Sequence, residues 1–285
     1  MMKLLRRLFQ VLPFCLLAVS AAAASQLPTR EQVDAAMKRT FGYDPGIVWQ
    51  IVDIRQTAIP DMADAIVSIN GRAPQHLYLS SDGKNAIIGE LIPFGIDPFA
   101  PARAKLLSAD GASRGAANPA IRIVTFSELE CPHCKAAQPI LDKLAADFPQ
   151  VRFTFQQFPL PASVHPWAMK AAEYADCAEQ QGPTAFWKYL NAIFENQDGI
   201  SAATVDDKLT ELARGVGLDE GLLATCVASP ETEARVKKSV KLGQLLDVTS
   251  VPTVFINGRK VTAITNIPYK NLKNLVRFEI DHAER

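Results

Sequence analysis

FSELECPHCK, residues 126–135, joins a predicted buried strand, residues 121–126, to a predicted helix, residues 132–148. Cys131 therefore stands at the N-terminus of a helix, where unpaired amide groups and the helix dipole favour a negative charge. Pro132 suits the first helical turn, because no hydrogen-bond partner is lost there. His133 adds positive charge or a hydrogen bond near the sulfur. The stretch predicts a redox-active cysteine pair.

The two cysteines of this pair are expected to differ in their roles. We expect Cys131 to be exposed and to take part in the first exchange, while the more buried Cys134 resolves the mixed disulfide. A stabilised thiolate favours the reduced form, which makes the corresponding disulfide a better oxidant.

Three other uses of a Cys-x-x-Cys pair are less well supported. Attachment of haem needs His directly after the second cysteine, and this chain has Lys135 there. A structural zinc site needs two further ligands at motif spacing, and the sequence has no second Cys-x-x-Cys or His pair. A purely structural disulfide is disfavoured because so short a loop at a helix start is a poor staple. We therefore expect no metal and no bound cofactor.

The order of elements around this pair indicates an α/β fold with a central mixed sheet. A second strand is predicted at residues 151–155 and a long helical stretch at about 166–246, broken at Gly182, Gly199, Gly217 and Pro230. A hairpin follows, with strands 253–256 and 260–263 around the turn Asn257-Gly258. A closing helix spans residues 269–280. Pro252 directly precedes the hairpin, and together with the distant cysteine pair it is expected to form a cis bond with Val251.

Taken together, the run Phe126–Lys135, the Val251-Pro252 pair and the Asn257-Gly258 hairpin resemble the DsbA-like branch of the thioredoxin superfamily. The resemblance covers residues 120–285 and implies a thioredoxin fold with a helical insertion at about 164–246. His165-Pro166-Trp167-Ala168 and Phe186-Trp187 also resemble that insertion, and we assign them to ordinary helix packing.

The resemblance also implies residue roles. Cys131 would be the nucleophile, Cys134 the resolving thiol and His133 the residue that tunes the first. Val251 and Pro252 would bind an extended client segment through the backbone, as in strand addition. One position departs from the pattern: many relatives carry a buried acid six residues before the first cysteine, where this chain has Thr125. Glu128 and Glu130 are the candidates to replace it, unless both are solvated.

The N-terminal part of the chain is predicted to hold three further segments. Residues 1–24 combine basic Lys3, Arg6 and Arg7 with an apolar run that ends in small residues, which is typical of a signal peptide cleaved near Ala24. Residues 25–107 predict a small α+β accessory domain, with one helix, strands and a hairpin turn at Asp82-Gly83. The Gly- and Ala-rich residues 108–119 are interpreted as a linker. The run Leu77–Lys84 weakly resembles the small domain that precedes the thioredoxin domain in dimeric periplasmic isomerases.

The mature chain would keep two more cysteines, Cys177 and Cys226, because Cys15 leaves with the signal. An even number of cysteines in an exported protein favours disulfides. We expect these two to form a structural disulfide within the helical insertion. Two buried free thiols, or a second exchange site that passes electrons to the first pair, are the alternatives.

Composition limits the classes of partner. The 285 residues carry 30 basic and 30 acidic side chains, so the net charge gives no reason to expect nucleic acid. We expect an exported or periplasmic dithiol oxidase that acts on cysteine-containing client proteins and exchanges electrons with a membrane redox partner. The alternatives are an isomerase or reductase, with a homodimer formed through the N-terminal domain, and a non-catalytic client-binding or chaperone protein.

Overall fold

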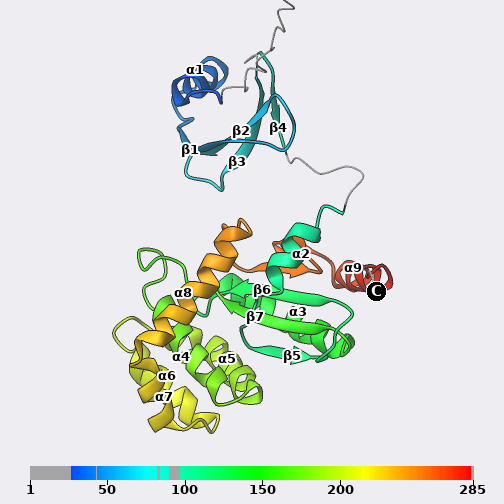
Figure 1. The fold of residues 1–285 in the computed structure, drawn as a ribbon. Helices are drawn as coiled ribbons and strands as arrows, with labels where there is room; N and C mark the ends of the chain where they lie inside the picture. The colour runs from blue at the N-terminus through cyan, green and yellow to red at the C-terminus, as the bar shows by residue number, and fades with distance from the viewer. Residues whose placement is uncertain (1–26, 43, 82–83, 90–96, 284–285) are drawn as a thin grey trace, which may run out of the picture. The chain divides into compact units, whose positions relative to one another are not determined.

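The computed structural model describes residues 27–42, 44–81, 84–89 and 97–283, and the chain divides into two compact units, Met1–Leu91 and Ile92–Arg285 (Figure 1). The predicted signal segment and the predicted turn at Asp82-Gly83 lie outside the described residues. Within the described ranges, no helix has the length and apolar character needed to cross a membrane.

The N-terminal unit packs one helix on an antiparallel sheet. Helix α1 (Arg30–Phe41) begins with a capping box, in which Thr29 and Gln32 each bond the other's backbone amide. The strands follow in the order β1-β2-β3-β4 and are β1 (Trp49–Gln56), β2 (Met62–Ile69), β3 (Gln75–Ser80) and β4 (Ala86–Ile88). Their apolar side chains and the helix enclose a small core made of Val33, Met37, Ala65, Val67 and Leu79.

The C-terminal unit is built on a five-stranded mixed sheet in the order β5-β7-β6-β8-β9. Its strands are β5 (Ser113–Gly115), β6 (Arg122–Ser127), β7 (Arg152–Gln157), β8 (Thr253–Ile256) and β9 (Arg259–Thr262). Strands β6 and β7 run parallel, and the other neighbours are antiparallel. The predicted α/β fold with a central mixed sheet is thus confirmed.

Alternating side chains of the sheet contribute to two hydrophobic cores. Along β6, Ile123 belongs to one core and its neighbour Val124 to the other. The first core holds residues of helices α3 (Pro132–Asp147) and α9 (Tyr269–Asp281). The second core joins the sheet to the helical insertion.

The insertion consists of five α-helices. They gather beside one end of the sheet (Figure 1). They are α4 (Ala168–Gln180), α5 (Pro183–Asn196), α6 (Val205–Gly215), α7 (Glu220–Val227) and α8 (Pro230–Leu245). The predicted breaks at Gly182 and Pro230 separate α4 from α5 and α7 from α8. Helix α8 returns to the sheet, where it contacts β7.

The segment interpreted as a linker, residues 108–119, belongs to the C-terminal unit instead. It follows helix α2 (Ala100–Leu106), and its strand β5 pairs with β7. A Cβ at Gly111 would lie 2.0 Å from the carbonyl oxygen of Phe155, and one at Gly115, where φ is +92°, would lie 2.0 Å from that of Val151. The glycines therefore permit close backbone approach, and the boundary between the units lies earlier, near residue 91.

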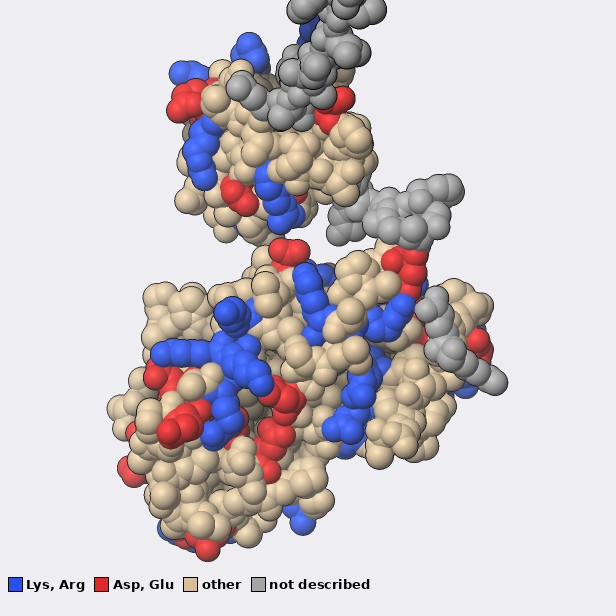
Figure 2. Space-filling model, in the orientation of Figure 1, with Lys and Arg blue, Asp and Glu red and all other residues tan. Residues whose placement is uncertain are grey.

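Charged side chains of both signs are interspersed on the visible face of the C-terminal unit (Figure 2). Some of the opposite charges of this unit form ion pairs. Two examples are Arg235 with Asp176 and Lys238 with Asp110. This surface agrees with the balanced composition of the chain.

Candidate active site

The junction between β6 and α3 positions the cysteine pair. Strand β6 ends at Ser127, and Cys131 is the N-cap of α3, followed by Pro132 in the first turn. The amides of Cys134 and Lys135 donate to the carbonyl oxygen of Cys131, each at 3.1 Å, and so close that turn. Both thiols are free.

The expected exposure of Cys131 is not found. Cys131 is 4% exposed and Cys134 is 1% exposed. The cover over Cys131 comes from a distant part of the chain, since its thiol donates to the carbonyl oxygen of Val251 at 3.9 Å.

Strand pairing explains how Val251 reaches the cysteine. The last residues of β6 pair with the first residues of β8, with Phe126 opposite Thr253. The segment that precedes β8 therefore meets the segment that follows β6. The Val251-Pro252 peptide bond in this segment is cis, and both residues are buried.

The environment of the two sulfurs separates their acidities. A hydrogen bond from the Cys134 side chain is the main cause that lowers the pKa of Cys131 to about 6, against the opposing effect of burial. Backbone amides of Cys134 and His133 and the charge of His165 act in the same direction. Burial, followed by the bond to Cys131, raises the pKa of Cys134 well above its ordinary value. Cys131 is thus the group that ionises first.

Acidic residues also lie close to the pair. Thr125 is buried in β6, and Glu128, in the segment after that strand, is 1% exposed. The Glu128 carboxylate accepts the backbone N–H of Glu130 and bonds Nδ1 of His165. Burial raises the pKa of Glu128 to about 7. Of the two candidates to replace the acid missing at Thr125, Glu128 is the buried one.

Residues 108–277 match a family model described as Thioredoxin. The match spans more than half of the 285 residues. The chain belongs to the thioredoxin family. The matched residues include both Cys131 and Cys134.

Solved structures of other proteins share the fold of this domain. The chain is similar to BdbD from Bacillus subtilis, with 20% identity and a TM-score of 0.54 over 60% of this chain and 93% of that one. It is also similar to the thiol-disulfide exchange protein α-DsbA2 from Wolbachia pipientis, with 17% identity and a TM-score of 0.55 over 63% and 96% of the two chains. These likenesses concern the thioredoxin fold.

Curated relatives share only part of their length with this thioredoxin-family chain. They include the Na(+)/H(+) antiporter NhaA 3 of Salinispora tropica, 32% identical over 147 residues, and NhaA 1 of Salinispora arenicola, 31% identical over 154 residues. The matches cover 52% and 54% of this chain but 22% of each antiporter. Because the chain spans about a fifth of their length, their ion transport is not transferred to it.

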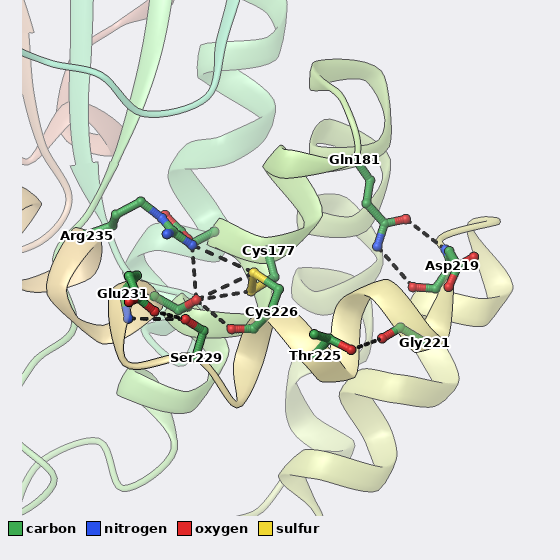
Figure 3. The surroundings of a disulfide bond; sticks show 11 residues. Cys177, Gln181, Asp219, Gly221, Thr225, Cys226, Ser229, Glu231 and Arg235 are labelled. Atoms are coloured by element: carbon green, nitrogen blue, oxygen red, sulfur yellow. Dashed lines mark hydrogen bonds and ion pairs between the residues drawn. A yellow bond between two sulfur atoms is a disulfide. The ribbon is translucent and has the colours of Figure 1, made fainter.

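The second cysteine pair of the thioredoxin-family chain forms a disulfide between α4 and α7 (Figure 3). The hydroxyl of Thr232, on α8, lies 3.6 Å from the sulfur of Cys177 and 3.5 Å from that of Cys226. It also donates to the carbonyl oxygen of Cys226 at 2.6 Å. Arg235, also on α8, forms an ion pair with Asp176 on α4. The disulfide and its polar neighbours thus tie three helices together.

Potential metal ligands gather at one place in the described part of the chain, where Asp176 lies beside Cys177 and Cys226. Both sulfurs are held in the disulfide. Since a metal needs deprotonated thiolates as ligands, this group does not fit one.

Sequence reasoning missed the place of His165. The motif His165-Pro166-Trp167-Ala168 was assigned to helix packing, which describes Phe186 and Trp187, whose rings pack against Phe155. His165 instead lies against the buried carboxylate of Glu128, and its charge acts on Cys131. A polar residue inside a motif of apolar neighbours was the available signal.

Proposed function

We propose that this protein is an exported dithiol oxidase that donates a Cys131–Cys134 disulfide to folding proteins. The observation that carries the proposal is the position of Cys131 at the N-cap of α3, where the Cys134 side chain and backbone amides lower its pKa to about 6, while burial raises the pKa of Cys134. A thiolate stabilised in the reduced form makes reduction of the disulfide favourable, so electrons flow from the client to the protein.

In the proposed reaction a client thiolate attacks the sulfur of Cys131 in the disulfide form. The Cys131–Cys134 bond breaks, and Cys134 leaves with the electron pair and takes up a proton. A second client thiolate then attacks the client sulfur of the mixed disulfide, and Cys131 leaves as a thiolate. The client has lost two electrons and gained a disulfide, while the protein holds the dithiol.

Val251 and Pro252 are the proposed binding site for the client backbone. The support for this role is their position, since the Val251 carbonyl meets the sulfur of Cys131. An extended client segment placed beside them would bring its cysteine to the reacting sulfur, with main-chain hydrogen bonds supplying affinity.

Oxidation of reduced, unfolded ribonuclease by the oxidised protein tests the proposal. We expect client thiols to disappear in step with the return of ribonuclease activity. Cys131→Ser and Cys134→Ser should each abolish both signals, because neither variant can hold the Cys131–Cys134 disulfide that is donated. Unchanged oxidation by Cys131→Ser would support the non-catalytic client-binding alternative.

An isomerase or reductase kept reduced by a membrane partner is the second candidate. The N-terminal unit favours it, because a small antiparallel domain ahead of a thioredoxin domain resembles dimeric isomerases. The reduction potential separates the two. A value near about −120 mV supports the oxidase, and one near about −270 mV, where the disulfide is too stable to donate, supports the reductase. Either role needs a membrane redox partner to restore the active form.

We further propose that the protein forms a homodimer through the N-terminal unit in the periplasm or another exported location. Strand β4 supports the proposed homodimer. It is the last strand in the order of its sheet, and its Ile87 and Ile88 side chains are 59% and 64% exposed. Sedimentation of the mature protein should give a dimer that Ile87→Asp/Ile88→Asp dissociates.

N-terminal sequencing of the exported protein should place cleavage near Ala24.

A further inference from the structure

A buried carboxylate and an imidazole form a pair beside the cysteines. Glu128 is three residues before Cys131, and its side chain is almost fully buried. Its one oxygen accepts the amide of Glu130, and the other bonds Nδ1 of His165. Burial is the main cause that raises the pKa of Cys134, and the backbone amide of Glu128 opposes it. Glu128 thus lies in the segment that leads into Cys131, and its side chain is bonded to His165.

A second carboxylate fixes the segment that carries His165. Glu130 accepts the backbone N–H of Trp167 at 2.7 Å, just before helix α4 begins at Ala168. The amide of His165 is itself bonded to the carbonyl oxygen of Pro161 at 3.0 Å. Two acidic side chains from the segment after β6 therefore hold the loop before α4 against the start of α3. Such anchoring gives the imidazole a set position relative to Cys131.

We propose that His165, oriented by Glu128, supplies a positive charge that stabilises the Cys131 thiolate and so tunes the reactivity of the cysteine pair. The inference rests on the proposed thiol–disulfide function and deepens it. His165 is a positioning residue in this scheme, because it acts through the field at Cys131 and forms no bond to the client.

The surroundings of Cys131 favour His165 over the histidine of the motif as this source of charge. His133 is exposed, and its contribution to the acidity of Cys131 comes from its backbone amide. His165 acts on Cys131 through its charge, and it is largely shielded from solvent, with 18% of its side chain exposed. A charge that is partly removed from water is screened less than an exposed one.

The groups that face this site from the packed segments are few among the described residues. Glu128 and Glu130 come from the segment after β6, Cys131 and Cys134 from the start of α3, and His165 from the loop before α4. The pKa of Glu128 is raised to about 7, and the charge of His165 lowers it while the charge of Cys131 raises it. Ionisation of the Cys131 thiol and ionisation of the Glu128 carboxyl are therefore linked.

The consequence for exchange concerns the second step of the proposed reaction. When Cys131 leaves the mixed disulfide as a thiolate, a protonated His165 offsets the new negative charge. Without that charge the thiolate is less stable, so the reduced form is disfavoured and the disulfide becomes a weaker oxidant.

Three variants test the role of the charge. His165→Asn keeps an amide donor for Glu128 and removes the charge, and His165→Lys restores a charge. The chain also offers a matched control: His76, whose Nδ1 lies 3.0 Å from both carboxylate oxygens of buried Asp64 in the N-terminal unit. The measurements are the pH titration of the Cys131 thiolate by its ultraviolet absorbance, and the redox equilibrium with glutathione, each in the full mature chain.

We expect His165→Asn to raise the titration midpoint and to lower the equilibrium constant for reduction by about tenfold, equivalent to about 30 mV. His165→Lys should restore both values, and His76→Asn should change neither. The proposal is overturned if a folded His165→Asn titrates like the wild type, or if His165→Lys behaves like His165→Asn. If the wild type itself does not exchange with glutathione, the proposed function fails instead.

Discussion

The two cysteine pairs of this thioredoxin-family protein lie in opposite chemical settings. Cys131 and Cys134 are separated by two residues at a helix start, while Cys177 and Cys226 are 49 positions apart and join two helices. Amides, a neighbouring thiol and the charge of His165 favour a thiolate at Cys131. Around the second pair a threonine hydroxyl and an arginine secure the helices that the disulfide connects. Local placement therefore separates a free pair with one acidic thiol, for which we propose the redox role, from a pair that is bonded between two helices.

The largest expected difference between the pairs is in activity. Cys131→Ser should lower the rate of client oxidation by about a thousandfold or more, because the attacked sulfur is lost. Stopped-flow or quenched oxidation of a reduced client measures this rate. Cys177→Ala/Cys226→Ala is the matched control and should keep the wild-type rate. A comparable loss in that control would mean that the second pair belongs to the electron path.

Stability should show the reverse order. Removing the Cys177–Cys226 disulfide by the double alanine substitution should lower the free energy of unfolding by about 4 kcal/mol, the chain-entropy cost of freeing a loop of about 50 residues. Denaturant unfolding followed by circular dichroism measures the change. An unchanged midpoint would show that packing alone holds α4 and α7 together.

The pH dependence of thiol reactivity sharpens the contrast further. With a pKa of about 6, Cys131 should be mostly thiolate at pH 7. Alkylation by iodoacetamide should then fall as the pH drops through about 6. An ordinary cysteine with a pKa near 8.5 has about thirtyfold less thiolate at pH 7. A midpoint above 8 would contradict the proposed stabilisation of Cys131.

The same lowered pKa has a consequence for the stability of the reduced protein. The thiolate's contribution is fully present above the pKa of the unfolded thiol and is lost as the pH falls through about 6. At pH 7 it should amount to about 1 kcal/mol. The reduced wild type should therefore gain stability relative to Cys131→Ser between pH 6 and pH 9, whereas the disulfide between Cys177 and Cys226 has no thiol to titrate.

The smallest expected effect is a loss of stability when a hydrogen bond beside the Cys177–Cys226 disulfide is removed. Thr232→Val removes the hydroxyl that bonds the half-buried Cys226 carbonyl, and it should cost about 1 kcal/mol, because one hydrogen bond is lost while the carbonyl keeps the bond from the Ser229 amide. Thr225→Val on α7 is a matched control, since it also removes a bond to a backbone carbonyl, that of Gly221, but at an exposed position. Equal melting temperatures for the two variants would assign no special role to Thr232.

Much of the thioredoxin domain followed from local pattern. The strand before Cys131, the helix after it and the breaks at Gly182 and Pro230 all lie where periodicity and helix-ending residues placed them. The prediction of a linker at residues 108–119 was wrong, because Gly111 and Gly115 permit close approach between strands, and such glycines cannot be told from those of a flexible linker by sequence alone. Strand β5 has only three residues, too few to show an alternating pattern.

The sequence by itself determined the kind of chemistry, because a Cys-x-x-Cys pair at a helix start draws its reactivity from neighbours in the same turn. Only the tertiary structure decided what surrounds that pair. The carbonyl of Val251 meets Cys131 through the pairing of β6 with β8, and His165 is bonded to Glu128, three residues before Cys131. Glu128 differs from a solvated surface acid because it is buried, and this burial also depends on tertiary packing. These contacts join residues 37 to 120 positions apart, and no periodicity of the chain encodes a distance of that kind.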